Sequence, residues 1–200
     1  MRNLFLFFLF INSFAMAQNL NSNQLPYKSI PEYQESYNSG NIVIRMIQGL
    51  GYRYYWATEG LTPDDMSYVP SESGQSLLET LEHIYGLANI VKNTSKNFPS
   101  SRPAKYIPSN WSELRSQTLT FLEEAATNLK NKTPDELSKL HVIFERGGNL
   151  STFPFWNMIN GPLSDAIYHT GQIVSFRRSS GNPIPKGTNV FMGKTKQYNK

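Results

Sequence analysis

The chain has 200 residues, no cysteine and a formal net charge of +4 at neutral pH. This length is enough for one domain with a buried core. The lack of cysteine excludes disulfides, thiolate catalysis and thiolate metal ligands, and the scattered basic residues form no stripe interleaved with aromatic side chains that would predict a nucleic-acid partner.

The N-terminus has the pattern of a secretory signal peptide. Arg2 supplies the positive charge, and Leu4 to Phe14 form an apolar stretch that is too short to span a bilayer. The small-x-small motif that a signal peptidase accepts follows directly and ends at Ala17. We therefore predict a signal peptide over residues 1–17, cleavage after Ala17, and a periplasmic or secreted mature protein with no membrane segment.

The next residues, 18–38, are rich in Asn, Gln, Ser and Pro and predict an extended leader. From about Asn41, apolar residues recur at three- and four-residue intervals and predict a first helix, which ends before Gly60. Thr62 followed by Pro63 and two aspartates predicts a capped turn or short helix. A second helix is expected from near Ser73, with its apolar arc formed by Leu77, Leu81, Ile84, Ala88 and Val91.

Residues 97–108 contain three prolines and several serines and predict a loop. Asn110 and Glu113 are typical of a helix start, and a third helix is expected from there, with an apolar side formed by Leu114, Phe121, Ala125 and Leu129. The sequence Thr-Pro-Asp-Glu at 133–136 predicts a short capped helix. The apolar, partly β-branched run at 140–144 predicts an extended connector or small strand.

A fourth long helix is expected to begin between Pro154 and Pro162 and to end near Ser180, just before Gly181. The tail from Asn182 should leave this helix and lie over the others, with a basic end at residues 193–200.

Asp165 and His169 stand four residues apart on this fourth helix, so both side chains project in nearly the same direction. His83, at the edge of the apolar arc of the second helix, is a third candidate ligand from a facing helix. Two imidazoles and one carboxylate leave coordination positions open, as a catalytic metal site requires. Two other interpretations stay open: a carboxylate and a histidine also form an orienting hydrogen bond, and an edge histidine is more often a core residue.

Other polar residues have a functional and a structural interpretation. Glu79, one turn before His83, is a candidate catalytic base or fourth ligand, although a solvated glutamate is commoner. Arg177 and Arg178 would attract an anionic substrate, yet arginine also favours a helix C-terminus. We interpret His141 as structural and expect Gln172 to form a hydrogen bond within the bundle of predicted helices.

Three stretches resemble proteins of the DinB/YfiT-like family: YRYYWATEGL at 52–61, LEHIYGL at 81–87 and NGPLSDAIYHTGQI at 160–173. The similarity extends over residues 39–192. It implies an all-α fold, a four-helix bundle in up-down-down-up order, here with the short extended connector before the last helix. It also implies a divalent metal held by three histidines, of which His83 and His169 match two, while Asp165 stands where the third is expected.

The resemblance further implies a metal-dependent enzyme, a hydrolase or transferase acting on a small molecule, with Zn, Ni, Mn or Fe as the metal. Export favours hydrolysis or small-molecule binding over thiol-dependent transfer, because low-molecular-weight thiols are chiefly cytosolic. Family members often pair through their helix faces, so a homodimer is also expected. The alternative is a non-catalytic, exported bundle protein that binds a metal or another ligand or takes part in a stress response.

Overall fold

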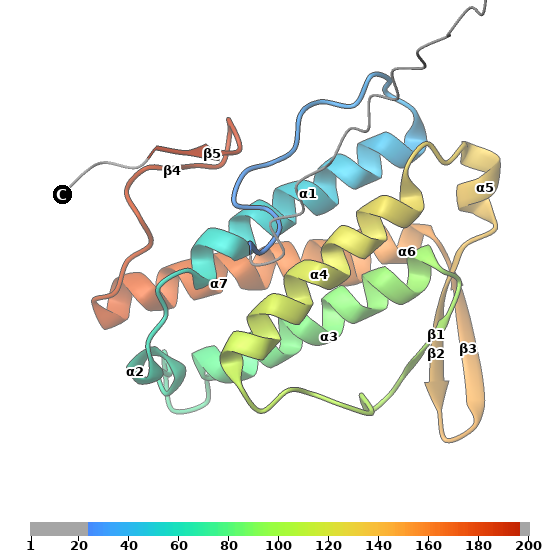
Figure 1. Ribbon diagram of the computed structural model, residues 1–200. Coiled ribbons are helices and arrows are strands. Elements are labelled where there is room, and N and C mark those ends of the chain that lie inside the picture. The colour runs from blue at the N-terminus through green and yellow to red at the C-terminus, as the bar shows by residue number, and fades with distance from the viewer. Residues whose placement is uncertain (1–23, 197–200) are drawn as a thin grey trace, which may run out of the picture.

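The computed structural model describes residues 24–196 (Figure 1). The predicted signal peptide lies outside these residues, as do the first part of the predicted leader and the last part of the predicted basic tail. The described chain is mostly helical, with four long helices: α1 (Ser39–Thr58), α3 (Leu77–Ser95), α4 (Trp111–Leu129) and α7 (Ser164–Ser180). Three short helices accompany them: α2 (Pro63–Met66), α5 (Pro134–Ser138) and α6 (Trp156–Met158). Within residues 24–196, no helix combines the length and the apolar character that a membrane crossing needs.

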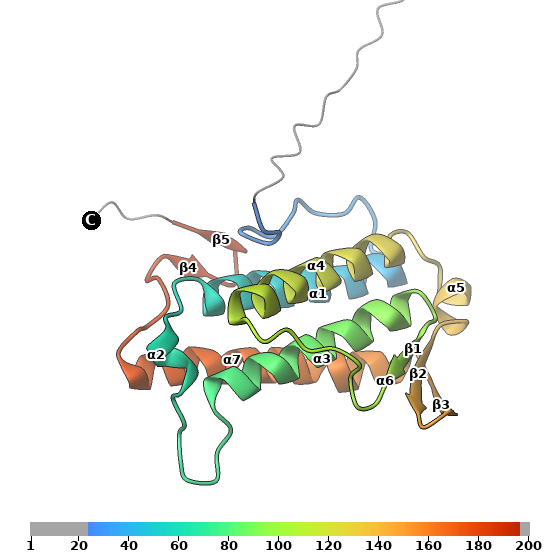
Figure 2. The ribbon, with the colours of Figure 1, turned by 60° about the horizontal axis from the view of Figure 1, so that its bottom comes forward.

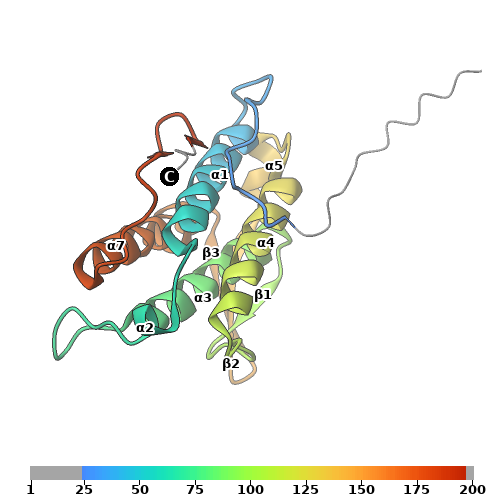
Figure 3. The same cartoon turned by 60° about the vertical axis from the view of Figure 1, so that its left-hand side comes forward.

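The four long helices pack side by side around one core and form what we call the helical body. α1 contacts α4 and α7, and α3 contacts the same two helices. Figure 2 shows these helices as two layers, with α1 and α4 over α3 and α7, and in Figure 3 α4 and α7 lie on either side of α1 and α3. The apolar arc predicted for the second helix is fully buried, with no exposed surface on Leu77, Leu81, Ile84, Ala88 or Val91. Periodicity in the sequence therefore predicted the inward face of α3 correctly.

Local hydrogen bonds fix where the helices begin and end. α3 starts at Leu77, four residues after Ser73, because Ser76 is the N-cap. The Ser76 hydroxyl accepts from the N–H of Glu79, while the Glu79 carboxylate accepts from the N–H of Ser76. α5 has the same reciprocal cap, between Thr133 and Glu136. Gly181, with φ of 90°, ends α7 in the left-handed conformation that glycine adopts without a steric penalty.

The structure contains more sheet than the predicted all-α fold with one extended connector. β2 (His141–Arg146) is that connector, but it forms a hairpin with β3 (Asn149–Pro154) across two glycines of positive φ, Gly147 and Gly148. β1 (Pro99–Ser101) lies in the predicted loop and pairs in parallel with β2. The prediction missed β1 because a Pro-Ser-Ser segment has no strand pattern of its own, and its pairing partner is about forty residues away along the chain.

The C-terminal tail lies against the helical body, as predicted. Its two short strands, β4 (Thr188–Asn189) and β5 (Lys194–Thr195), pair with each other. The hydroxyl of Tyr52 in α1 lies 2.7 Å from the Thr195 hydroxyl and accepts a hydrogen bond from the N–H of Asn189. A buried tyrosine of α1 thus holds the tail in place.

The chain enters α7 through a wide turn, η1 (Ile159–Leu163), which follows α6 directly. Pro162 has no N–H to donate, and Gly161 leaves the helical conformation, with φ −92° and ψ −109°. The N–H of Ser164 reaches back five residues to the carbonyl of Ile159, and the Ser164 hydroxyl also donates to that carbonyl at 2.7 Å. η1 therefore leads directly into the first turn of α7, which contains Asp165.

Candidate metal centre

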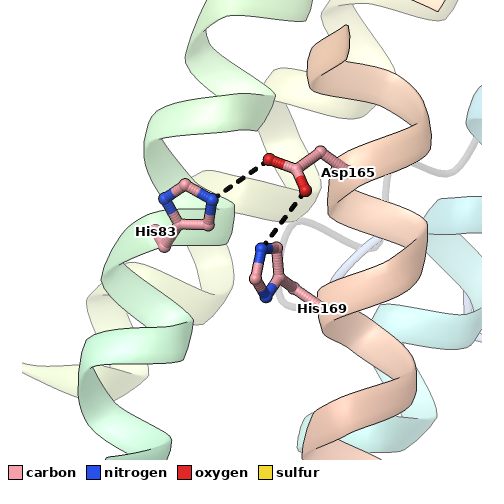
Figure 4. Close-up of side chains that lie close together, drawn as sticks. All are labelled: His83, Asp165 and His169. Atoms are coloured by element: carbon pink, nitrogen blue, oxygen red, sulfur yellow. Dashed lines mark hydrogen bonds and ion pairs between the residues drawn. The ribbon is translucent and has the colours of Figure 1, made fainter. Parts of the chain in front are cut away.

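Two neighbouring helices, α3 and α7, supply the three predicted ligands. His83 lies in the second turn of α3, and Asp165 and His169 lie on successive turns of α7 (Figure 4). The two helices are in contact with each other. The three side chains point toward one another from these two helices (Figure 4).

The Asp165 carboxylate lies between the two imidazole rings. Its Oδ2 atom is 3.2 Å from His83 Nε2, and its Oδ1 atom is 3.2 Å from His169 Nε2. The two rings are 4.5 Å apart between centroids and nearly perpendicular, at 82°. One potential ligand atom from each residue can be chosen so that all three lie within 4.8 Å of one another.

The distance between each imidazole and the carboxylate suits two ligands of one divalent ion. Nitrogen and oxygen ligands bind such ions at about 2.0–2.2 Å, so two neighbouring ligands of one ion lie roughly 3.0–3.5 Å apart. Both imidazole–carboxylate distances, at 3.2 Å, fall in that range, each to a different oxygen of Asp165. The donor set is also chemically suitable, since imidazole and carboxylate bind Zn, Ni, Mn and Fe.

The group is open to solvent on one side. The side chains of His83 and Asp165 are 39% and 43% exposed, whereas that of His169 is 15% exposed. Solvent access leaves room for water or a small molecule beside the three ligands, which distinguishes this arrangement from a closed structural site. Asp165 also belongs to the first turn of α7, where the helix dipole favours a negative charge.

The same geometry also suits a purely polar cluster. A histidine that carries a hydrogen on Nε2 can donate it to the carboxylate oxygen of Asp165 that it faces. The orienting hydrogen bond expected as an alternative from the sequence therefore has the required geometry as well. In the polar cluster an N–H hydrogen lies between each ring and the carboxylate, and in the metal site the ion takes that place.

Glu79, the candidate base, does not belong to this group. Its carboxylate caps α3 and accepts hydrogen bonds from the Ser76 N–H and hydroxyl, at 2.7 and 2.8 Å. Both bonds hold the pKa of Glu79 below its ordinary value, and the bond from the backbone N–H has the larger effect. A carboxylate stabilised in this way is a weaker base, so the cap works against the catalytic role.

Arg177 is not available to a substrate. Its side chain is buried, and its guanidinium donates to the backbone carbonyls of Ala57 and Glu59, at 3.0 and 2.7 Å, and to that of Asn182 at 2.7 Å. Arg178 is exposed. The structural interpretation of Arg177 is therefore correct, with a stronger reason than its place at a helix end.

Two further polar residues have defined partners. His141 lies in β2 and does not belong to the group; its Nδ1 is 3.1 Å from the carbonyl oxygen of Lys139. Gln172 was expected to hydrogen-bond within the helical body, but its partner was not foreseen: its Oε1 lies 2.7 Å from Nδ1 of His169. The spacing of three residues between them was the available signal, because such pairs are neighbours on a helix surface.

Comparison with known proteins gives a structural match but no sequence match. No protein-family model and no curated protein sequence matches the chain. The structure is similar to the crystal structure of a DinB-like protein, YjoA, from Bacillus subtilis, with a TM-score of 0.54 and 16% sequence identity. The similarity covers 72% of this chain and 96% of that chain.

The chain has a DinB-like fold. The resemblance noted in the sequence is thus confirmed at the level of the fold. A fold hosts many activities, so the DinB-like fold alone does not define the function, and His83, Asp165 and His169 are the residues that bear on it.

Proposed function

We propose that this protein is an exported, divalent-metal-dependent enzyme, a hydrolase or transferase acting on a small molecule. The observation that carries the proposal is the convergence of two imidazoles and one carboxylate within 4.8 Å, on facing helices of a DinB-like fold. In helix bundles, metal sites are built from such side chains.

Each residue of the site has a defined role in this proposal. His83 and His169 each offer Nε2, and Asp165 offers a carboxylate oxygen to balance the charge of the ion. When bound, a divalent ion supplies Lewis-acid chemistry, either by making water more acidic or by polarising a carbonyl group. The exposed side of His83 and Asp165 is where a substrate would approach. Carboxylate in place of a third imidazole makes the donor set harder and compatible with Zn, Ni, Mn or Fe.

A non-catalytic role, holding a metal or another ligand without turnover, is the second candidate. It is favoured by the engagement of Glu79 in the cap of α3, which removes the expected base from the site. The group around the carboxylate comprises only His83, Asp165 and His169 among the described residues. In this interpretation, the protein binds the ion or its ligand and supplies no proton-transfer group.

The proposal extends to the arrangement of the chain. The up-down-down-up order of the four long helices is supported by Figure 1, where α1 and α7 run in one direction and α3 and α4 in the other. Export with cleavage after Ala17, and residues 39–192 as one domain, are supported by the sequence pattern. N-terminal sequencing of the exported protein tests the cleavage site, and sedimentation tests the expected homodimer.

Metal analysis of the mature protein is the decisive experiment. Purified residues 18–200, titrated at neutral pH with Zn, Mn, Ni and Fe(II), should take up one ion per chain. His83→Ala should lower the affinity by at least about 100-fold, because a ligand is lost. His141→Ala is the matched control and should bind as the wild type does, since His141 lies outside the group. A wild type that takes up no divalent ion would exclude the metal site.

A turnover assay then separates the two candidates. The metal-loaded protein is offered a panel of simple esters, amides and phosphoesters, with the metal-free protein and His83→Ala as controls. Metal-dependent hydrolysis that disappears in His83→Ala supports the hydrolase. Tight metal binding without turnover on this panel and on transferase substrates supports the binding role.

A further inference from the structure

Gln172 contacts one of the proposed ligands from the side that faces away from the carboxylate. It lies one turn after His169 on α7, and its Oε1 is 2.7 Å from Nδ1 of that histidine. The other ring nitrogen, Nε2, lies 3.2 Å from Oδ1 of Asp165. The ring of His169 is therefore held between two oxygen atoms, one on each nitrogen.

Both oxygens that face the His169 ring are acceptors, and the shorter contact, 2.7 Å to Gln172 against 3.2 Å to Asp165, favours the single proton of a neutral ring on Nδ1. An amide oxygen can only accept a hydrogen bond, so a bond of 2.7 Å to Nδ1 requires a proton on Nδ1. A neutral imidazole carries one proton, so Nε2 then has a free lone pair. This lone pair faces the Asp165 carboxylate, which also only accepts. Two acceptors at 3.2 Å attract each other only through a cation placed between them.

The two histidines of the site differ in this respect. Nε2 of His83 is likewise 3.2 Å from the carboxylate, but its Nδ1 has no hydrogen-bond partner among residues 24–196. The His83 side chain is also more exposed than that of His169, 39% against 15%. Of these two histidines, therefore, only His169 has a hydrogen-bond partner on Nδ1 within the described residues.

We propose that Gln172 is a positioning residue that holds His169 in the Nδ1–H tautomer and thereby presents the Nε2 lone pair to a divalent ion. This inference rests on the proposed metal site and names the residue that prepares it. Histidine ligands commonly donate their second N–H to an oxygen, and losing that oxygen weakens metal binding by about 10- to 100-fold. Since Asp165 is itself a proposed ligand, Gln172 takes the orienting role.

Two substitutions separate the acceptor oxygen from the bulk of the side chain. Gln172→Met keeps the length of the side chain and removes the acceptor, whereas Gln172→Glu keeps an acceptor for Nδ1–H. Gln117→Met on α4 is the matched control: the Gln117 Oε1 also accepts a hydrogen bond, from the Tyr85 hydroxyl, but contacts no histidine. All proteins are mature chains purified without metal, and unfolding curves establish that each variant is folded.

The first measurement is zinc affinity, by competition with a chelator of known affinity. Gln172→Met should raise the Kd for zinc by about 10- to 100-fold. Gln172→Glu and Gln117→Met should stay within about threefold of the wild type, well short of the 10-fold effect. A Gln172→Met protein that binds zinc as tightly as the wild type overturns the proposal.

The second measurement needs no metal. Nitrogen-15 spectra of the imidazole groups, recorded above neutral pH, should show the Nδ1–H tautomer for His169 in the wild type and in Gln172→Glu, and a shift toward Nε2–H in Gln172→Met. An Nε2–H tautomer in the metal-free wild type overturns the proposal. If the wild type binds no zinc, the proposed metal site fails, and this spectrum alone then decides the role of Gln172.

Discussion

The two ends of α7 carry polar side chains in contrasting surroundings. Asp165 and His169, near its start, are partly exposed and contact one another and a side chain of α3. Arg177, near its end, is 2% exposed and donates to backbone carbonyls at the end of α1. Arg177 therefore satisfies acceptors that a helix end leaves without partners. The Asp165 group satisfies no backbone atom, so it is available for a ligand.

The largest expected effect is on stability, at the Arg177 end. Arg177→Met should lower the free energy of unfolding by about 3–5 kcal/mol, because it leaves the carbonyls of Ala57, Glu59 and Asn182 without this donor. Urea unfolding measures the change. The exposed neighbour provides the control, and Arg178→Met should stay within about 0.5 kcal/mol of the wild type. A loss below about 1 kcal/mol in Arg177→Met would contradict the structural role of Arg177 at this end of α7.

The next largest effect is the stabilisation of the folded protein by zinc at the Asp165 end of α7. Zinc at about 100 times its Kd should raise the free energy of unfolding by about 2.7 kcal/mol, since only the folded protein has the site. The gain should shrink as the pH falls, because protons compete with the metal for the imidazoles of His83 and His169. Unfolding curves with and without zinc at several pH values measure it. His141→Ala should keep the gain and His83→Ala should lose it; an equal gain in both would place the ion elsewhere.

Asp65 links α2 to the end of α7, and its replacement should have an intermediate effect on the free energy of unfolding. Burial raises the pKa of its carboxyl group, but hydrogen bonds from Thr62 and Asn182 more than offset this, so that the pKa is lowered. Asp65→Ala should cost about 1–3 kcal/mol at neutral pH. Since the folded pKa is depressed, this contribution is present above the ordinary value of about 3.9 and is lost as the pH falls through the folded value.

Urea unfolding at pH 7 and in acid tests the direction of this change. The difference between wild type and Asp65→Ala should shrink in acid, whereas the exposed neighbour, in Asp64→Ala, should show little difference at either pH. A difference that grows on acidification would contradict a lowered pKa.

The smallest effect is expected for the metal-free site. His83→Ala and Asp165→Ala should each change the free energy of unfolding by no more than about 1 kcal/mol, because the pair is partly exposed and screened by solvent. Urea unfolding of chelator-treated protein measures this. A loss above about 2 kcal/mol would give the His83–Asp165 pair a structural role like that of Arg177.

The sequence by itself determined the local features of this protein. Apolar residues at helical spacing predicted the buried faces of the long helices, and reciprocal caps such as Thr133 with Glu136 predicted helix starts. It also determined that Asp165 and His169 share one side of α7, because side-chain direction in a helix depends only on spacing. These features depend on neighbours within a few residues, so no knowledge of the fold is required to find them.

Only the tertiary structure decided which distant groups meet. His83 reaches Asp165 across 82 positions of the chain, and Arg177 reaches the carbonyl of Ala57 across 120. The sequence could not predict that Asp165 is partly exposed and Arg177 buried, since both are polar residues on α7. Their surroundings depend on how α1 and α3 pack against α7, and that packing is set by the burial of all the apolar faces together.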